Sequence, residues 1–157
     1  MTMGRKQLEE LREKGYYFSV PKGISMKPMI QNRRGIVEIH TLKDIAKKYD
    51  VVLYNRIRPQ FPDGQGVLHR VIEVHDDHYI IMGDNCWQRE YVLHKDTVGI
   101  MTRFYRKGRW IDVNDKGYQL YVRIWMLTMP VRRPLFFIRD KAKGLLRKVY
   151  RFICPRK

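Results

Sequence analysis

Three short segments of the sequence carry side chains that together could perform acyl-transfer chemistry. Ser25 follows Gly23, which frees the backbone, and precedes Pro28, which restricts it, so we expect an exposed turn of fixed shape. His69 lies in an aliphatic run, and an imidazole is the side chain best suited to act as a base near neutral pH. Asp84 lies in a Gly-Asp-Asn turn after a second aliphatic run. A base can activate a serine hydroxyl, and a carboxylate can hold the other ring N–H of that base.

Each of these segments also has an ordinary structural explanation when it is taken alone. A serine in a Gly/Pro loop is usually a turn residue, and Gly-Asp-Asn is normally a tight turn. If residues 67–74 form a strand, His69 shares one face with Val67 and Val71, and Arg70 lies on the other face. Neither face is cleanly apolar, which weakens a purely structural explanation for His69.

The elements that must position these residues are expected to be short strands. Aliphatic and β-branched runs separated by turn residues predict strands at 37–39, 50–55, 67–74, 79–82, 98–105 and 110–113. The third and fourth runs flank a polar turn and predict a hairpin, and the last two predict a second hairpin. Prolines and glycines at 59–66 predict a turn region. The expected fold class is therefore mostly β, an antiparallel β domain.

Helices are expected at both ends of the chain. Residues 1–15 are polar and predict a short N-terminal helix. Between Ile138 and Ile153 the apolar residues fall on one helical face, and Lys and Arg fill the other, which predicts an amphipathic helix. The composition changes near residues 114–118. We therefore predict an N-terminal helix at 1–17, a β domain at 18–115 and a basic amphipathic tail at 116–157.

The positive charge of the chain is concentrated in that tail. The 157 residues carry 32 Lys and Arg against 16 Asp and Glu, a formal net charge of +16. Residues 118–157 hold eleven basic residues and one acidic residue, so they account for +10. The apolar content of the tail favours an anionic membrane surface as its partner, and makes nucleic acid the less favoured one. The alternative is a helix that packs its apolar face on the β domain. The pattern leaves the oligomeric state open.

Composition excludes several other classes of protein. With 44% hydrophobic residues the chain can form a core, which excludes wholesale disorder. Two cysteines, Cys86 and Cys154, form no disulfide framework and no clustered zinc motif. His75 and His78 flank two aspartates, and a solvated hairpin turn explains them better than a metal site. We therefore expect no metal and no cofactor.

The N-terminal segment and the hydropathy pattern bear on location. The first fifteen residues lack the apolar region of a signal peptide. No stretch reaches the ~18 apolar residues that a membrane-spanning helix needs. We expect a protein that is cytoplasmic or attached peripherally to the cytoplasmic face of a membrane.

The order of the segments resembles the type I signal peptidase family, in the branch found in the endoplasmic reticulum and in archaea. Four boxes carry the resemblance: Gly-Ile-Ser-Met-Lys-Pro at 23–28, Tyr-Asp-Val-Val at 49–52, Leu-His-Arg-Val-Ile at 68–72 and Gly-Asp-Asn at 83–85. It covers about residues 21–113. Bacterial relatives place Lys where this chain has His69. Three positions depart from the family pattern: Tyr49 replaces Gly, Met82 stands where Lys is common, and Cys86 replaces a second Asn.

The resemblance implies a serine endopeptidase on a fold of antiparallel sheets. Ser25 would be the nucleophile, His69 the general base and then acid, and Asp84 the carboxylate that orients His69. The backbone N–H of Ser25 or Met26 would form part of the oxyanion hole. The substrate would be a leader or signal-like peptide, or a preprotein, with small residues before the scissile bond. The N-terminal membrane anchor of the family has no counterpart here, so we expect a specialised relative that acts at the cytoplasmic face.

Two other interpretations are consistent with the same pattern. A LexA-like self-cleaving regulator shares the implied fold but uses a Ser/Lys pair. His69, and the lack of a helix-turn-helix pattern near the N-terminus, count against it. The other is a protein without catalysis, which binds a membrane surface or nucleic acid on the same fold.

Overall fold

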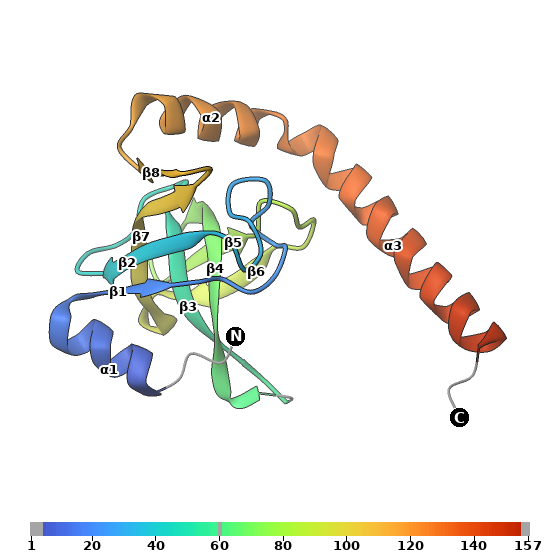
Figure 1. The fold of residues 1–157 in the computed structure, drawn as a ribbon, viewed down its shortest axis with the longest axis horizontal. Helices are drawn as coiled ribbons and strands as arrows, with labels where there is room; N and C mark the ends of the chain where they lie inside the picture. The colour runs from blue at the N-terminus through green and yellow to red at the C-terminus, as the bar shows by residue number, and fades with distance from the viewer. Residues whose placement is uncertain (1–4, 60, 155–157) are drawn as a thin grey trace.

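The computed structural model describes residues 5–59 and 61–154, which form an antiparallel sheet with helices at both ends (Figure 1). Helix α1 (Arg5–Lys14) precedes the sheet, and α2 (Lys116–Leu127) and α3 (Met129–Ile153) follow it. The predicted mostly β fold with a short N-terminal helix and a helical C-terminal tail is therefore confirmed. The strands are β1 (Tyr16–Ser19), β2 (Ile36–Thr41), β3 (Val51–Arg58), β4 (Phe61–Val74), β5 (His78–Met82), β6 (Glu90–Leu93), β7 (Thr97–Arg106) and β8 (Arg109–Asp112), with a 3-10 turn, η1 (His94–Asp96), before β7.

The strands form one sheet in the order β1-β2-β7-β3-β4-β5-β6, and β8 pairs with β7. Both predicted hairpins are present, β4 with β5 and β7 with β8. Lys107 and Gly108, between β7 and β8, both have positive φ, 49° and 83°. This is the geometry of a type I′ turn, whose twist matches that of the strands it joins. No sequence pattern predicted β1 and β6, which lie at the two ends of the order.

Strand β4 is longer than its sequence pattern predicts. It begins at Phe61, so most of the 59–66 region, where prolines and glycines predict a turn, belongs to a strand. The ladder with β3 runs from Val51 opposite Arg70 to Arg58 opposite Phe61, whereas β5 pairs with β4 only from Arg70 onward. Among the described residues, the first part of β4 therefore has a strand partner on one side. Such an edge tolerates proline and glycine.

The core consists of two apolar clusters that share strand β3. Val51 and Leu53 belong to the first cluster, and Val52 and Tyr54 belong to the second, as expected for side chains that alternate between faces. The first cluster also contains Met26, so it holds the loop that carries Ser25. Both faces of β3 are thus covered.

The C-terminal tail has a packed part and an exposed part. Tyr118, Val122 and Met126 of α2, and Met129 at the start of α3, are buried in the first cluster. In contrast, every residue of 141–154 is exposed. Figure 1 shows α3 extending away from the sheet. The alternative in which the predicted helix at 138–153 packs its apolar face on the β domain therefore does not hold for residues 141–154. The part of the tail that does pack is α2 with the start of α3.

No helix in the described ranges is both long enough and apolar enough to cross a bilayer. Helix α3 has 25 residues, but Lys and Arg are spread along it.

Candidate active site

Ser25 and His69 lie on one pocket. Ser25 is in the loop after β1, and His69 is on β4. Both line a cavity of about 310 Å³, together with Cys86 from the loop after β5 and Glu90 from the start of β6. His69 is only 4% exposed, whereas Ser25 is partly exposed. The structure therefore brings the predicted nucleophile and the predicted base to the same cavity.

Gly83 is the point where the Ser25 loop, His69 and Cys86 meet. A β-carbon on Gly83 would lie 2.8 Å from the Ser25 carbonyl oxygen, 2.9 Å from Cys86 Sγ and 3.0 Å from His69 Nε2. The backbone N–H of Asn85 donates to that same Ser25 carbonyl at 2.7 Å. The Gly83–Asn85 turn thus joins the Ser25 loop to the imidazole, and it requires a residue without a side chain.

Gly83→Ala is expected to destabilise the protein by about 1–3 kcal/mol, because the Ser25 carbonyl cannot move away without a shift of its loop. Gly117→Ala is the matched control, since a β-carbon there meets nothing within 4 Å. The control should be neutral or slightly stabilising. Urea unfolding of the two variants measures the difference, and equal free energies of unfolding would contradict the close contact.

The side chains beside His69 Nδ1 are Tyr54 and Glu90. Nδ1 lies 3.3 Å from Tyr54 Oη and 3.3 Å from Glu90 Oε1. Tyr54 Oη donates to Glu90 Oε2 at 3.0 Å, and Arg56 donates to Tyr54 Oη at 2.8 Å and to Glu90 Oε1. The carboxylate of Glu90 beside Nδ1 favours the His69 tautomer that carries its proton on Nδ1. The tautomer is assigned from these hydrogen-bond partners. Nε2, on the Gly83 side, is then free to accept a proton.

Asp84 binds Arg70, so the prediction that Asp84 orients His69 is wrong. Arg70 Nε donates to Oδ1 and Nη2 donates to Oδ2, each at 2.8 Å, and both side chains are fully buried. His69 and Arg70 are neighbours on β4 and therefore project to opposite faces. A carboxylate held by Arg70 does not reach the imidazole, and Glu90 takes that place.

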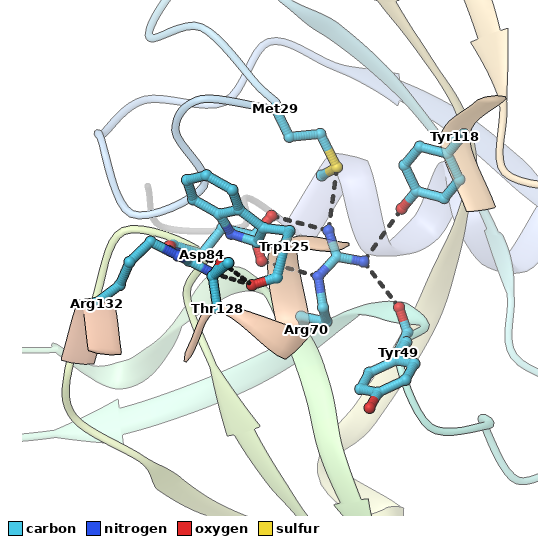
Figure 2. A network of polar contacts seen from close by, with 8 residues as sticks. All are labelled: Met29, Tyr49, Arg70, Asp84, Tyr118, Trp125, Thr128 and Arg132. Atoms are coloured by element: carbon cyan, nitrogen blue, oxygen red, sulfur yellow. Dashed lines mark hydrogen bonds and ion pairs between the residues drawn. The ribbon is translucent and has the colours of Figure 1, made fainter. Parts of the chain in front are cut away.

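Arg70 is the centre of a buried polar network (Figure 2). Besides Asp84, it donates to the Tyr49 carbonyl at 2.8 Å, to Tyr118 Oη at 3.2 Å and to Met29 Sδ at 3.2 Å. Burial lowers the pKa of the Arg70 guanidinium, but the charge and hydrogen bonds of Asp84 outweigh burial and raise it. Arg70 therefore stays charged and connects four separate segments of the chain.

The surroundings of Glu90 hold it ionised. Burial raises the pKa of its carboxyl, but hydrogen bonding and charge from His69, and then Arg56, outweigh burial and lower the pKa to about 2. The pKa of Glu90 in the folded protein is thus below the ordinary glutamate value of 4.5. Ionised Glu90 therefore contributes to stability above about pH 4.5, and the contribution is lost as the pH falls toward 2.

The free energy of unfolding of the wild-type protein is expected to fall more steeply than that of Glu90→Gln between about pH 5 and pH 3, because the unfolded wild-type chain takes up one more proton there. Urea unfolding at a series of pH values gives both slopes. Glu13→Gln removes a carboxyl from the exposed surface of α1 and should keep a slope close to that of the wild type. Parallel slopes for wild type and Glu90→Gln would contradict the low pKa of Glu90.

The backbone amides of Ser25 and Met26 have no acceptor among the described residues. Both residues line the pocket. Met26 is only 5% exposed, and its burial in the first cluster fixes this part of the loop. If Ser25 is the nucleophile, as the sequence predicts, these two amides are in the position that oxyanion-hole donors require.

Three arginines of α3 bind backbone and side-chain oxygens of the loop after β5. The contacts are Arg132 to the Asp84 carbonyl (3.5 Å), Arg133 to the Trp87 carbonyl (2.8 Å), and Arg139 to Asn85 Oδ1 (2.6 Å) and the Asn85 carbonyl (3.0 Å). The first half of α3 therefore braces the loop that also carries Cys86 of the pocket. These arginines have a structural use within the chain.

Among the described residues, the other reactive side chains form no second centre of this kind. Burial, and the charges of Glu90 and Asp140, raise the pKa of the Cys86 thiol, which disfavours the thiolate. His75 and His78 stack on each other, with 4.4 Å between ring centres, at the surface hairpin. In the part of the chain that the structure describes, no group of three or more His, Cys, Asp or Glu side chains is placed to hold a metal ion.

Sequence reasoning missed Glu90, Tyr54 and Arg56. Val52, Tyr54 and Arg56 are every second residue of β3 and so share one face, and Val52 lies opposite His69 in the ladder. This alternation is a signal that the sequence contains, but it becomes usable only when the register of β3 against β4 is known. Glu90 is the first residue of β6, a strand that no sequence pattern predicted.

Searches against models of protein families, curated proteins and solved structures find no match.

Proposed function

We propose that the protein is a serine endopeptidase of the signal-peptidase type, in which Ser25 is the nucleophile and His69 the general base. The observation that carries the proposal is the environment of the imidazole. Its Nε2 faces the turn that binds the Ser25 loop, and its Nδ1 lies beside the ionised carboxylate of Glu90. Glu90 thus orients the imidazole through Nδ1, and Nε2 is left to accept the proton of the serine hydroxyl.

The mechanism follows from these positions. Ser25 Oγ attacks the peptide carbonyl while His69 Nε2 takes its proton, and Glu90 stabilises the imidazolium that forms. The Ser25 and Met26 amides stabilise the oxyanion. His69 then returns the proton to the leaving amine, and water activated by His69 resolves the acyl-enzyme. In the described residues Ser25 Oγ makes no hydrogen bond to His69, so a bound substrate must bring the two groups within ~3 Å.

The pocket suits an extended peptide. Its walls include β1 on one side and residues 65–69 of β4 on the other. Among the described residues, β1 pairs only with β2, and this part of β4 pairs only with β3. Residues 65–69 of β4 thus present an edge at which a substrate backbone can add by strand pairing. Ile30, Val37 and Leu53 give the cavity an apolar lining, which favours small apolar side chains near the scissile bond.

Peptide-library profiling tests the proposed activity. The wild-type protein and Ser25→Ala are each incubated with a complex mixture of peptides, and new termini are identified by mass spectrometry. We expect termini that only the wild type produces, preceded by small residues. Identical sets of termini from the two proteins, or none from the wild type, would contradict the proposal.

We propose further that the protein acts at the cytoplasmic face of a membrane, to which the exposed half of α3 attaches it peripherally. Leu145, Leu146, Phe152 and Ile153 are 64–89% exposed, and no described residue covers them. The basic residues of the same stretch are Lys141, Lys143, Arg147, Lys148 and Arg151. An apolar face flanked by cations fits the anionic lipids of the cytoplasmic leaflet.

Replacement of those five basic residues by glutamine is expected to weaken binding to vesicles that contain phosphatidylglycerol by about tenfold or more, since each contributes roughly 1 kcal/mol near an anionic surface. A matched variant replaces five exposed basic residues of the body: Arg33, Arg34, Lys43, Lys47 and Lys107. It has the same net charge and should bind nearly as well as the wild type. Flotation of the three proteins gives the comparison, and equal losses would assign the binding to net charge alone.

A further inference from the structure

A second cavity lies where α2 meets α3. It has a volume of about 590 Å³, which is within the range of ligand pockets. Its lining is contributed by the loop before β3, by β4, by the loop after β5 and by the α2–α3 junction. The apolar and aromatic side chains that line it include Ile72, Trp87, Met126, Met129 and Phe137. The cavity is separate from the one that holds Ser25 and His69, although the loop carrying Trp87 borders both.

The charges around this second cavity are mostly positive. Lys48, Arg89 and Arg133 line it, against the one carboxylate of Glu73. Glu73 accepts a hydrogen bond from Arg89 at 2.8 Å, so these two charges offset each other. Arg133 uses Nε on the Trp87 carbonyl, and its two terminal nitrogens donate to no other described residue. Lys48 is exposed and lies 5.3 Å from the Tyr49 ring centre. Two cations without a carboxylate partner thus border an apolar cavity.

We propose that this cavity binds one molecule of an anionic lipid, with the acyl chain against the apolar lining and the phosphate between Arg133 and Lys48. An apolar wall beside uncompensated cations is complementary to an amphiphile with a negative head. The position of the cavity supports a lipid as the occupant. It lies at the root of α3, whose outer half is a cationic helix with an uncovered apolar face. The site does not depend on the proposed peptidase activity.

Lysophosphatidylglycerol, used below its critical micelle concentration, is the probe for this site. Native mass spectrometry and calorimetry should show one molecule bound per chain. Lysophosphatidylcholine, which has no net charge, and glycerol 3-phosphate, which has no acyl chain, should each bind at least about tenfold more weakly. Equal binding of either compound would overturn the proposal, because the cavity would then recognise only a chain or only a phosphate.

Three variants locate the bound lipid. Ile72→Trp fills the cavity and Arg133→Gln removes a cation, and each should raise the Kd for lysophosphatidylglycerol by about tenfold or more. Lys48 is exposed and, unlike Arg133, donates to no backbone carbonyl. Lys48→Gln should therefore leave the fold intact, and should raise the Kd by a smaller factor than Arg133→Gln. Arg147→Gln is the control for charge on exposed α3 and should leave the Kd within about twofold. Unchanged binding by Ile72→Trp and Lys48→Gln, or an equal loss in Arg147→Gln, would overturn the proposal.

Discussion

Ser25→Ala is expected to lower kcat/KM for a substrate peptide by on the order of 10⁴- to 10⁶-fold, because alanine has no oxygen with which to form the acyl-enzyme. His69→Ala should cause a loss of similar size, since the serine hydroxyl then keeps its proton. The double variant should be hardly slower than either single variant, because the two groups act in one step. The rates are measured with a peptide taken from the library profile.

Controls separate catalysis from folding in this series. His75→Ala removes an exposed imidazole at the hairpin surface and should retain the wild-type rate. Glu90→Gln should lower kcat/KM even under conditions in which the variant is fully folded, because a neutral amide does not stabilise the imidazolium. If Ser25→Ala or His69→Ala still turned over the peptide at the wild-type rate, the proposed pair would be wrong.

Arg70→Met is expected to lower the free energy of unfolding by about 3–5 kcal/mol, because it leaves the fully buried carboxylate of Asp84 without its partner. Lys14→Met is the matched control. It breaks the ion pair with Glu10, in which the two side chains are 58% and 44% exposed. Exposed pairs of this kind contribute little, so the control should leave the free energy of unfolding close to that of the wild type. Urea unfolding measures both variants.

A double-mutant cycle distinguishes the pair from its individual members. Asp84→Leu alone should also destabilise strongly, since it leaves the Arg70 charge buried. Arg70→Met with Asp84→Leu should be more stable than either single variant, because no unpaired charge remains. Additive losses in the double variant would show that the two residues act through other contacts.

The sequence predicted the local parts of the fold well. The hairpins at β4–β5 and β7–β8 follow from aliphatic runs and short polar turns, which are local signals. The choice between Asp84 and Glu90 as the partner of His69 is not local. Both carboxylates follow the same strand, and only the path of the loop between β5 and β6 delivers one to Arg70 and the other to His69. Alternation along β4 placed His69 and Arg70 on opposite faces, but it could not assign a carboxylate to each.

The tail shows a second limit of sequence patterns. The periodicity of residues 138–153 correctly predicts a helix, but the helix begins at Met129 and is preceded by α2. Tyr118, Val122 and Met126 pack in the core of the sheet, which no count of charges reveals. The same applies to Arg132 and Arg139, whose terminal guanidinium nitrogens donate to carbonyl and amide oxygens of the chain itself. Net charge therefore overstates what the tail offers to a partner.

The Arg70 network also determines where this chain can be shortened. Its acceptors come from the Ser25 loop, the loop before β3, the turn after β5 and α2. A chain that stopped before Tyr118 would therefore lose one side of a buried guanidinium. A protease acting on the folded protein should cut readily after the exposed basic residues beyond Asp140 and leave the rest intact. The smallest stable fragment would then end close to Arg139, with α2 and the first half of α3 retained as parts of the folded body.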